Sequence, residues 1–538
     1  MDDTHHALLE IAREARGGVR GDPATCELYA VDASLYTRRP IGALQAACAD
    51  DLALAVDACA RHDIPLTMRG AGTSLAGQSL GRGLVVDCSA MRGITVDPIS
   101  RTARVEPGVV LDDLNRAASV HGLMFGPDVA TSSRATLGGM IGNNSAGARS
   151  VVHGMTADHL VELDVVLADG TRTTLRRGGP APTALEEVRA LATDQGFPDL
   201  MRRVSGYALD RLVGPEPDWP AFLSGSEGTL AVLVGATVRL VQPPAARALA
   251  VVPYTDVDQA LAAVPGLLDT GPSAIELMDA ALVDPANRQP RERALLSLVH
   301  SASAMLVVEY SGEAGDVRER AAAIPGASVI ADPADQAAIW TIRRTGIARA
   351  LRAEGDAKPI PFIEDPAVPP DRLAAFAREV RALLGDEDMG DAVWYGHASV
   401  GCLHIRPMVD LRATGAAERV RRVAEGVADL VHAHGGSLSG EHGDGRLRGE
   451  LLPRMYDPSM IERFAQAKHA LDPRGILNPG VIVDPDPMDE GFRIAASPPL
   501  RHIGTDVSFD HAGGLQRAVE ACNGNGQCRR SDAVMCPS

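Results

Sequence analysis

The chain has 538 residues, which at roughly 100–200 residues per domain predicts about three to five domains. Hydrophobic residues make up 45% and charged residues 23%, which is normal globular usage and argues against a disordered, collagen-like or coiled-coil chain. The balance of 52 Lys+Arg against 70 Asp+Glu gives a formal net charge of −18, and no basic cluster is dense enough for nucleic acid. No signal peptide and no run of about 18 apolar residues is present, so we expect a cytosolic protein or one peripheral to the inner face of a membrane.

The first part of the chain alternates helical and strand-like segments. Apolar spacing predicts a helix near the N-terminus and another over residues 47–62. Residues 64–89 are typical of a strand, a glycine-rich loop and a second strand. β-Branched alternation on both sides of Pro98–Ser100 and of Asp169–Gly170 predicts two hairpins, with a short helix over 112–121 between them.

The composition changes at Pro243–Pro244, which indicates a domain boundary. Residues 246–410 alternate strands with amphipathic helices, and a long helix is predicted over 414–434. From Val481 the chain becomes rich in Pro and Asp, which predicts a linker. We therefore expect an N-terminal segment (1–38), a first domain (39–243), a second domain (244–482) and a tail (483–538).

Two glycine-rich stretches stand out in the first domain. The loop Arg69–Gly77 has little Cβ bulk, so that its backbone N–H groups can converge on a phosphate. It differs from the dinucleotide fingerprint because a strand follows it, and from a P-loop because no Gly-Lys-Ser/Thr ends it. Alone, it is equally well explained as a tight connection between strands. Its pairing with Pro127–Asp128 and Thr136–Gly147 favours two loops that line one long polar ligand.

These stretches resemble a known flavoprotein superfamily. The motifs RGAGTSLAGQS, ATLGGMIGNNSAG, HGMTADHLVELDVVLADG and GSEGTLAVL are similar, in this order, to those of the vanillyl-alcohol-oxidase/PCMH superfamily. The resemblance implies an α+β fold, with a PCMH-type FAD-binding domain (39–243) followed by an FAD-linked oxidase C-terminal substrate domain (244–482). It also implies that FAD contacts Arg69, Gly70, Ala71, Gly72, Thr73, Ser74, Gly77, Gln78, Pro127, Asp128, Thr136, Gly138, Gly139, Asn143, Asn144, Ser145, Gly147, Glu227, Gly228 and Asn478.

Thr73 bears on how the flavin is held. Some relatives attach FAD covalently through a histidine at this position, and a threonine hydroxyl cannot form that bond. We therefore expect non-covalent FAD, and a small turn residue at position 73 agrees with this expectation.

Histidines and a glutamate cluster in the second domain. His397, His404, Glu441 and His442 lie in glycine-flanked segments that we expect at strand ends or turns. A lone histidine is more often an ordinary polar residue than a ligand. Two imidazoles and a carboxylate, however, are a common ligand set for a divalent ion with an open position for substrate.

The pattern GHxxxGxLH followed by GEHG resembles the FAD-linked D-2-hydroxyacid dehydrogenases, a group that includes D-lactate, glycolate and D-2-hydroxyglutarate dehydrogenases. The resemblance implies that His397, His404 and Glu441 bind a metal and that His442 is the base. We expect Zn²⁺, with Mn²⁺ or Fe²⁺ as alternatives. Residues 399–402 depart from the acidic and asparagine residues usual in this group, which leaves the metal identity open.

Cationic side chains are needed to hold an anionic substrate. Arg343 and Lys358 follow Trp340 as an arginine–lysine pair does in the related dehydrogenases, while the alternative for Arg343 is a solvated helix face. Hydroxyglutarate enzymes tend to carry a hydroxyl side chain where this chain has Ile347, which weakens the case for a second substrate carboxylate. The role of Arg406 stays open.

Three cysteines gather at the C-terminus. Cys522, Cys528 and Cys536, with Pro537 after the last, resemble the opening of a [4Fe–4S] ferredoxin-like module. The alternatives are a disordered tail or a zinc knuckle. Three thiolates cannot complete a four-cysteine cluster, so residues 483–538 are interpreted as a linker and a truncated start of the iron–sulfur half of a fused FAD/iron–sulfur dehydrogenase.

These observations predict an FAD-dependent dehydrogenase that oxidises a D-2-hydroxy acid to the 2-keto acid by hydride transfer to flavin N5. D-lactate is favoured over D-2-hydroxyglutarate, and electrons would pass through iron–sulfur to a quinone or cytochrome. The chain lacks a nicotinamide fingerprint, which argues against NAD. The alternatives are an O₂-using flavin oxidase and a non-catalytic flavin or iron–sulfur subunit.

Overall fold

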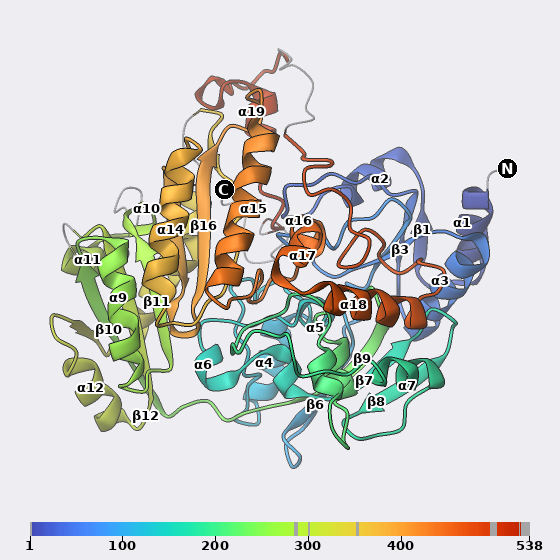
Figure 1. Cartoon of the computed structure of the whole chain (residues 1–538), viewed down its shortest axis with the longest axis horizontal. Coiled ribbons are helices and arrows are strands. Elements are labelled where there is room, and N and C mark those ends of the chain that lie inside the picture. Colours follow the sequence, from blue (N-terminus) through green and yellow to red (C-terminus); the bar gives the residue numbers. More distant parts are fainter. Residues whose placement is uncertain are drawn as a thin grey trace.

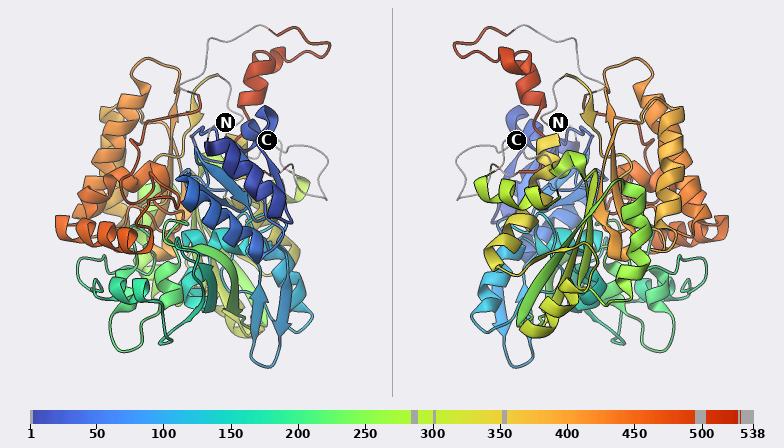
Figure 2. Two further views of the ribbon diagram at one scale, coloured as in Figure 1. Left: turned by 90° about the vertical axis from the view of Figure 1, so that its right-hand side faces the viewer. Right: turned by 90° about the vertical axis from the view of Figure 1, so that its left-hand side faces the viewer.

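The computed structural model describes residues 3–283, 289–299, 302–350, 355–494, 503–526 and 528. The fold is α+β and contains three sheets. Figure 1 shows the elements of the first sheet at the right, those of the seven-stranded sheet at the left and those of the five-stranded sheet below. Figure 2 shows the same parts from the two sides.

The first sheet carries the loop Arg69–Gly77. Its strand order is β1 (Gly18–Arg20), β2 (Gly42–Gln45), β4 (Leu84–Asp87) and β3 (Leu66–Arg69), and β2, β4 and β3 run parallel. Strand β4 is buried along its whole length, as expected for a parallel strand covered on both faces. Helices α1 (Asp3–Glu14) and α3 (Ala49–His62) supply apolar side chains to the same core, which includes Ile11, Leu52 and Val86. The loop leaves β3 at its carboxyl end, where parallel sheets bind ligands.

The second sheet is antiparallel, in the order β5 (Ile94–Asp97), β6 (Thr102–Val105), β9 (Val232–Arg239), β7 (Leu160–Val166) and β8 (Arg172–Arg176). Both predicted hairpins are confirmed, β5–β6 and β7–β8. The helices of this region are α2 (Pro23–Tyr29), α4 (Leu111–Ser119), α5 (Leu137–Asn143), α6 (Ser150–His153), α7 (Thr183–Arg189) and α8 (Trp219–Leu223).

The stretch 136–147 differs from the expected loop because part of it forms helix α5. Thr136 caps the helix, since its hydroxyl accepts a hydrogen bond from the N–H of Gly139 at 3.3 Å. Asn144 ends it in the left-handed conformation with φ 51°. The high glycine content of this stretch favours a loop, but the capping residues at its two ends indicate a short helix.

The third sheet has seven strands in the order β13 (Ser328–Ile330), β10 (Ala246–Tyr254), β12 (Ala304–Gly312), β11 (Ala274–Asp279), β15 (Ala392–His397), β16 (Cys402–Val409) and β14 (Lys358–Pro359). Alternate residues of β10 face opposite sides. Ala248 and Ala250 pack with α9 (Val257–Leu268), α12 (Ala314–Ala322) and α14 (Leu373–Asp386), whereas Leu249 and Val251 pack with α10 (Ala280–Val283), α11 (Pro290–Leu296) and α13 (Pro333–Ala350). Helix α15 (Ala416–Ala433), near the predicted 414–434, packs on α14.

We propose that the boundary between the two domains lies at residues 243–244. Strand β9 of the five-stranded sheet ends at Arg239, and β10 of the seven-stranded sheet begins at Ala246.

The chain returns to the first sheet after α16 (Gly445–Arg448), α17 (Leu452–Met455) and α18 (Pro458–Leu471). The N–H of Leu66 donates to the carbonyl of Ile476 at 2.7 Å. The segment expected as a linker is packed rather than free, since Met488 and Phe492 are fully buried and the Tyr36 hydroxyl donates to the carbonyl of Met488. Helix α19 (Leu515–Glu520) follows in the tail. Within the described residues, no helix has the length and apolarity needed to span a membrane.

Candidate functional site

One cavity of about 870 Å³ joins the glycine-rich stretches of the first domain to the histidines of the second. Its volume is that of a site for a large ligand. Of the predicted flavin contacts, those that line it are Arg69, Gly70, Ala71, Gly72, Thr73, Ser74, Gln78, Asp128, Thr136, Gly138, Gly139, Asn143, Ser145, Gly147, Glu227 and Gly228. The two stretches that the sequence paired therefore face one space.

Close backbone approach explains the glycines. A Cβ on Gly70 would lie 2.2 Å from the Thr136 hydroxyl oxygen, so the two stretches can meet only because residue 70 lacks a side chain. The side-chain amide of Gln78, directly after the first stretch, donates to Asn143 Oδ1 in the second stretch at 3.0 Å. It also donates to the backbone carbonyl of His442 in the second domain at 2.6 Å. Gln78 thus links the cofactor cradle to the histidine-bearing loop.

Four predicted flavin contacts do not line the cavity: Gly77, Pro127, Asn144 and Asn478. Gly77 adopts φ 82° against the ring of Tyr36. Asn144 accepts a hydrogen bond from the Ala157 N–H, and buried Asn478 donates to the carbonyls of Gln78 and Glu227. For Gly77, Asn144 and Asn478, these contacts support the loops behind the cavity wall.

Sheet register brings the histidines together. Glu276 of β11 pairs with His397 of β15, and Tyr395 pairs with His404 of β16. Residues at alternate positions share one face, so these side chains meet above the same part of the sheet. His397 lies at the end of its strand as expected, but His404 lies inside β16, so the expectation of a strand end or turn for it was wrong. His404 can be buried inside the strand because carboxylates contact both of its ring nitrogens.

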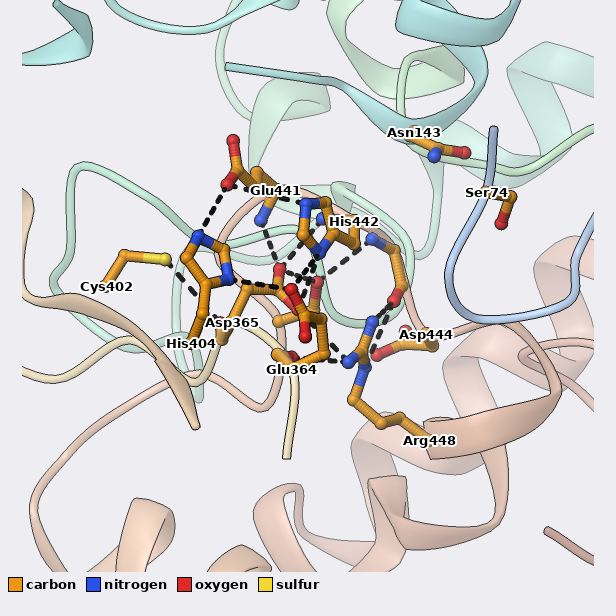
Figure 3. Close-up of polar contacts among 12 residues, drawn as sticks. Ser74, Asn143, Glu364, Asp365, Cys402, His404, Glu441, His442, Asp444 and Arg448 are labelled. Atoms are coloured by element: carbon orange, nitrogen blue, oxygen red, sulfur yellow. Dashed lines mark hydrogen bonds and ion pairs between the residues drawn. The ribbon is translucent and has the colours of Figure 1, made fainter. Parts of the chain in front are cut away.

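Glu441 is the common partner of the histidine cluster, defined here as His397, His404 and His442. Its Oε1 lies 3.1 Å, 3.4 Å and 3.5 Å from the Nε2 atoms of these residues in that order. Figure 3 shows the side chains of Glu441, His442 and His404 close together, with Ser74 and Asn143, the last residue of α5, on the neighbouring segments of the first domain. Ligand atoms of His397, His404 and Glu441 all lie within 4.8 Å of one another, which fits one divalent ion.

A second set of convergent atoms, from Glu364, His404 and His442, also lies within 4.8 Å. Its carboxylate, that of Glu364, pairs with Arg406 at 3.0 Å. Glu364 contacts His404 Nδ1 at 3.0 Å, on the ring side opposite Glu441. This contact fixes the ring orientation of His404. In the same way, the contact of Glu276 with Nδ1 of His397 at 2.6 Å fixes the ring of His397.

Buried charges shift the pKa values of the cluster. Burial disfavours the imidazolium of His404, but Glu364 and Glu441 outweigh it and raise its pKa to about 9. Burial likewise opposes ionisation of Glu441, yet Arg202 and His397 hold its pKa well below the usual range. Burial lowers the pKa of His442, against the pull of Asp365 and Glu441. Glu364 and Glu441 therefore favour positive charge on the His404 ring, whereas burial favours the neutral form of His442.

The loop that bears Glu441 and His442 is shaped by one buried carboxylate. Both backbone N–H groups donate to Asp365 Oδ2, at 2.7 Å and 2.8 Å. Gly443 follows with φ 84°, a conformation that favours glycine. Asp365 in turn pairs with Arg448 at 3.1 Å.

The predicted substrate cations have different surroundings. Arg343 is buried, pairs with Glu276 at 2.8 Å and stacks on Tyr395, so it is not on a solvated helix face. Arg344 is exposed, and both arginines line the cavity with Lys358 of β14. For Ile347, only the backbone lies within what the structure describes.

Sequence reasoning missed Arg202, Glu276, Glu364 and Asp365. Arg202 is fully buried, and its guanidinium donates to the Ser150 hydroxyl and the Gly147 carbonyl and pairs with Glu441 at 3.3 Å. A signal existed for the acids, because Glu276 interrupts the apolar stretch AIELM, and Glu364 and Asp365 follow the apolar stretch IPFI. Nothing near Arg202 in the sequence points to its partner.

The tail lies against the cavity. Cys522 and Cys528 are exposed free thiols, and Cys522 lines the cavity. Arg134 donates to the carbonyl of Asn525 at 2.7 Å, and Arg517 pairs with Asp356 at 2.6 Å. Cys536, the third predicted iron–sulfur ligand, lies outside the described residues.

A glycine-rich cradle and a histidine–carboxylate cluster thus face each other in one cavity. Residues 40–176 match the family described as FAD binding domain, and residues 243–482 match FAD linked oxidases, C-terminal domain. The chain belongs to the FAD-linked oxidase family of the vanillyl-alcohol-oxidase/PCMH flavoprotein superfamily.

Among similar proteins, a D-2-hydroxyglutarate dehydrogenase of Pseudomonas putida is 32% identical over 99% of this chain and 57% of its own length. A D-lactate dehydrogenase of Archaeoglobus fulgidus is 30% identical over 78% of this chain and 86% of its own length. The structure of 4-ethylphenol oxidase from Gulosibacter chungangensis shares the fold, with a TM-score of 0.63, 16% identity, and coverage of 89% of this chain and 97% of that one. The chain spans just over half the length of the Pseudomonas relative.

Proposed function

We propose that the chain is an FAD-dependent dehydrogenase that oxidises a D-2-hydroxy acid to the 2-keto acid. The observation that carries the proposal is the single cavity, which brings the flavin-binding stretches and the histidine cluster with Glu441 into one space. A flavin-binding or iron–sulfur subunit without turnover would have no need of a convergent ligand set beside a neutral histidine.

The described residues fit both proposed cofactors. Gly70 to Ser74 and the helix start at Thr136 would hold FAD, and Thr73 in place of a histidine supports non-covalent binding. His397, His404 and Glu441 would hold the divalent ion, for which two imidazoles and a carboxylate favour Zn²⁺. When bound, FAD supplies the hydride acceptor and the ion lowers the pKa of the substrate hydroxyl.

His442 takes the hydroxyl proton in this proposal. Its ring opens to the cavity, and burial lowers its pKa, so that it is neutral at physiological pH. Its Nδ1 faces Asp365 at 3.5 Å, which orients the ring and stabilises the imidazolium that forms. Arg343 and Lys358 line the same cavity and would hold the substrate carboxylate.

The proposed substrate follows from the relatives and from the cations that line the cavity. Relatives named for D-2-hydroxyglutarate and for D-lactate both match, so the preference for D-lactate drawn from the sequence gains no particular support. A second carboxylate would need a further cation, and exposed Arg344 lines the cavity one residue after Arg343. We therefore propose both acids as candidates.

The electron acceptor is proposed to lie beyond the tail. Cys522 lines the cavity that would hold the flavin, which supports an exit through an iron–sulfur cluster with Cys522, Cys528 and Cys536 among its ligands, towards a quinone or cytochrome. A flavin oxidase that uses O₂ is the competing candidate.

A dye-reduction screen over D- and L-2-hydroxy acids, with metal and flavin content measured on the same preparation, tests the proposal. We expect turnover with D-acids only, bound FAD released by acid precipitation, and close to one equivalent of divalent ion. Turnover that needs O₂ and ignores the dye would favour the oxidase, and no turnover with any acid would favour the subunit without catalysis.

A further inference from the structure

Each carboxylate that contacts the histidine cluster is itself paired with an arginine. Four such carboxylates occur among the described residues, and the shortest nitrogen–oxygen distances of the pairs range from 2.8 Å to 3.3 Å. All eight side chains belong to buried residues. The pairs are Glu276–Arg343, Glu364–Arg406, Glu441–Arg202 and Asp365–Arg448.

Arg202 shows most clearly that the pairing concerns charge. It comes from the first domain and is fully buried, yet its NH1 has no hydrogen-bond partner and lies 3.3 Å from Glu441 Oε2. The other oxygen of Glu441 faces the three imidazoles. A buried guanidinium is expensive to desolvate, so its position behind the proposed metal ligand requires a compensating electrostatic role.

The formal charges of the four carboxylates and four arginines cancel. We propose that this neutral cage leaves the full charge of a divalent ion for the substrate, and that the site stabilises the doubly deprotonated form of a bound 2-hydroxy acid. Such an acid carries one negative charge on its carboxylate and gains the second when the hydroxyl proton passes to His442. This inference rests on the proposed function. Carboxylates without arginines would cancel the ion's charge themselves and weaken its hold on an anion.

The test removes one cation from the cage. In Arg202→Gln, the charge of Glu441 is no longer balanced, so Zn²⁺ should bind about tenfold or more tightly. Oxalate, a dianion that chelates through two oxygens and carries no hydride, should bind the Zn²⁺-loaded protein at least about tenfold more weakly. Zn²⁺ affinity is measured by competition with a chromophoric chelator, and oxalate affinity by perturbation of the flavin spectrum.

Arg203→Gln is the matched control. Arg203 is the next residue, pairs with Asp210 and stacks on Phe197, and it does not touch the cluster. Both affinities should stay at wild-type values in this variant. Arg406→Gln, which frees Glu364, should repeat the effect of Arg202→Gln and decides the matter if Arg202→Gln does not retain FAD.

The outcomes separate this inference from the proposed function. If Arg202 only holds Glu441 in place by packing, removing Arg202 should weaken Zn²⁺ binding. A Zn²⁺ affinity that falls or stays constant in the folded variants would therefore overturn the charge proposal and leave the proposed function standing. If the wild-type protein binds no Zn²⁺, the metal site of the proposed function fails. In the wild type, Zn²⁺-loaded protein should also prefer oxalate to monoanionic pyruvate by about tenfold or more, and equal affinities would contradict the neutral cage.

Discussion

His442 differs from the other two members of the histidine cluster in its access to the cavity. Its side chain is 26% exposed, against 10% for His397 and 3% for His404. The carboxylates on both sides of the other two rings lie at 2.6–3.4 Å, whereas those that flank His442 lie at 3.5–3.7 Å. Their surroundings suit ligands with fixed orientation, and those of His442 suit a group that exchanges a proton with a bound substrate.

We expect His442→Ala to lower the rate of flavin reduction by substrate about 10²–10⁴-fold, the usual contribution of a general base. FAD should remain bound, because the His442 side chain forms no part of the glycine-rich cradle. Stopped-flow reduction and the flavin spectrum measure the two effects. His469→Ala, at an exposed position of α18, is the control, and a near wild-type rate in His442→Ala would remove this residue from the chemistry.

We expect a chelator to inactivate the protein reversibly without loss of FAD absorbance. Glu441→Gln keeps the size of the side chain but removes the negative charge, so divalent-ion affinity should fall about 10-fold or more, and excess Zn²⁺ should restore part of the activity. Metal analysis before and after dialysis checks both effects. A metal-free preparation with full activity would leave His397 and His404 as polar contacts only.

Site residues that form a short sequence motif can be predicted from the sequence, whereas residues that meet the site from distant segments cannot. His397, His404, Glu441 and His442 lie within short glycine-containing motifs, GHxxxGxLH and GEHG. Arg202 meets Glu441 only through the contact between the two domains, and no local pattern encodes such a pair. The role of Arg343 as a substrate cation stays a prediction, and no local pattern indicates its pair with Glu276, which lies 67 residues away in the chain.

Among the elements, the two glycine-rich stretches depend on each other. Their predicted pairing agrees with the cavity, whereas the predicted loop over 136–147 proved to contain α5. The capping residues Thr136 and Asn144 were visible in the sequence, but the glycines between them have low helix propensity and obscured the helix. Contact with the first stretch at Gly70 fixes where this helix begins.

We expect Gly70→Ala to weaken FAD binding roughly tenfold to a hundredfold, because overpacking costs about 1–3 kcal/mol where the new Cβ meets Thr136. Gly266→Ala is the matched control. A Cβ at Gly266 of α9 meets nothing within 4 Å, so this change should leave FAD affinity unaltered and stabilise the fold by about 0.4–1 kcal/mol. Fluorescence titration of apoprotein with FAD distinguishes the two, and equal affinities would show that the stretches can separate.

For the molecule as a whole, Arg149 joins the two domains beside the cavity. It contacts Asp128 at 2.6 Å in the first domain and makes a bidentate pair with fully buried Glu309 of β12 in the second. Its guanidinium also stacks on Trp340, one helical turn before Arg343. The domains were predicted from composition, but this junction could not be, since its partners lie far apart in the sequence.

We expect Arg149→Met to destabilise the protein by about 3–5 kcal/mol, because it leaves the Glu309 carboxylate buried without its main partner. Arg116→Met removes an exposed pair with Asp113 and should change the free energy of unfolding by less than about 1 kcal/mol. Denaturant titration of the two variants gives the comparison. Similar decreases in the free energy of unfolding of the two variants would mean that Arg149 stabilises the protein no more than an exposed ion pair does.

Anaerobic reduction of the bound flavin tests the central claim most directly, because it needs no knowledge of the physiological acceptor. With FAD and Zn²⁺ bound, addition of D-lactate or D-2-hydroxyglutarate should bleach the visible absorbance of the flavin and yield one molecule of 2-keto acid for each FAD reduced. The L-enantiomers should leave the spectrum unchanged. A loaded protein whose flavin stays oxidised with every D-2-hydroxy acid, or is reduced equally by L-acids, would contradict the account.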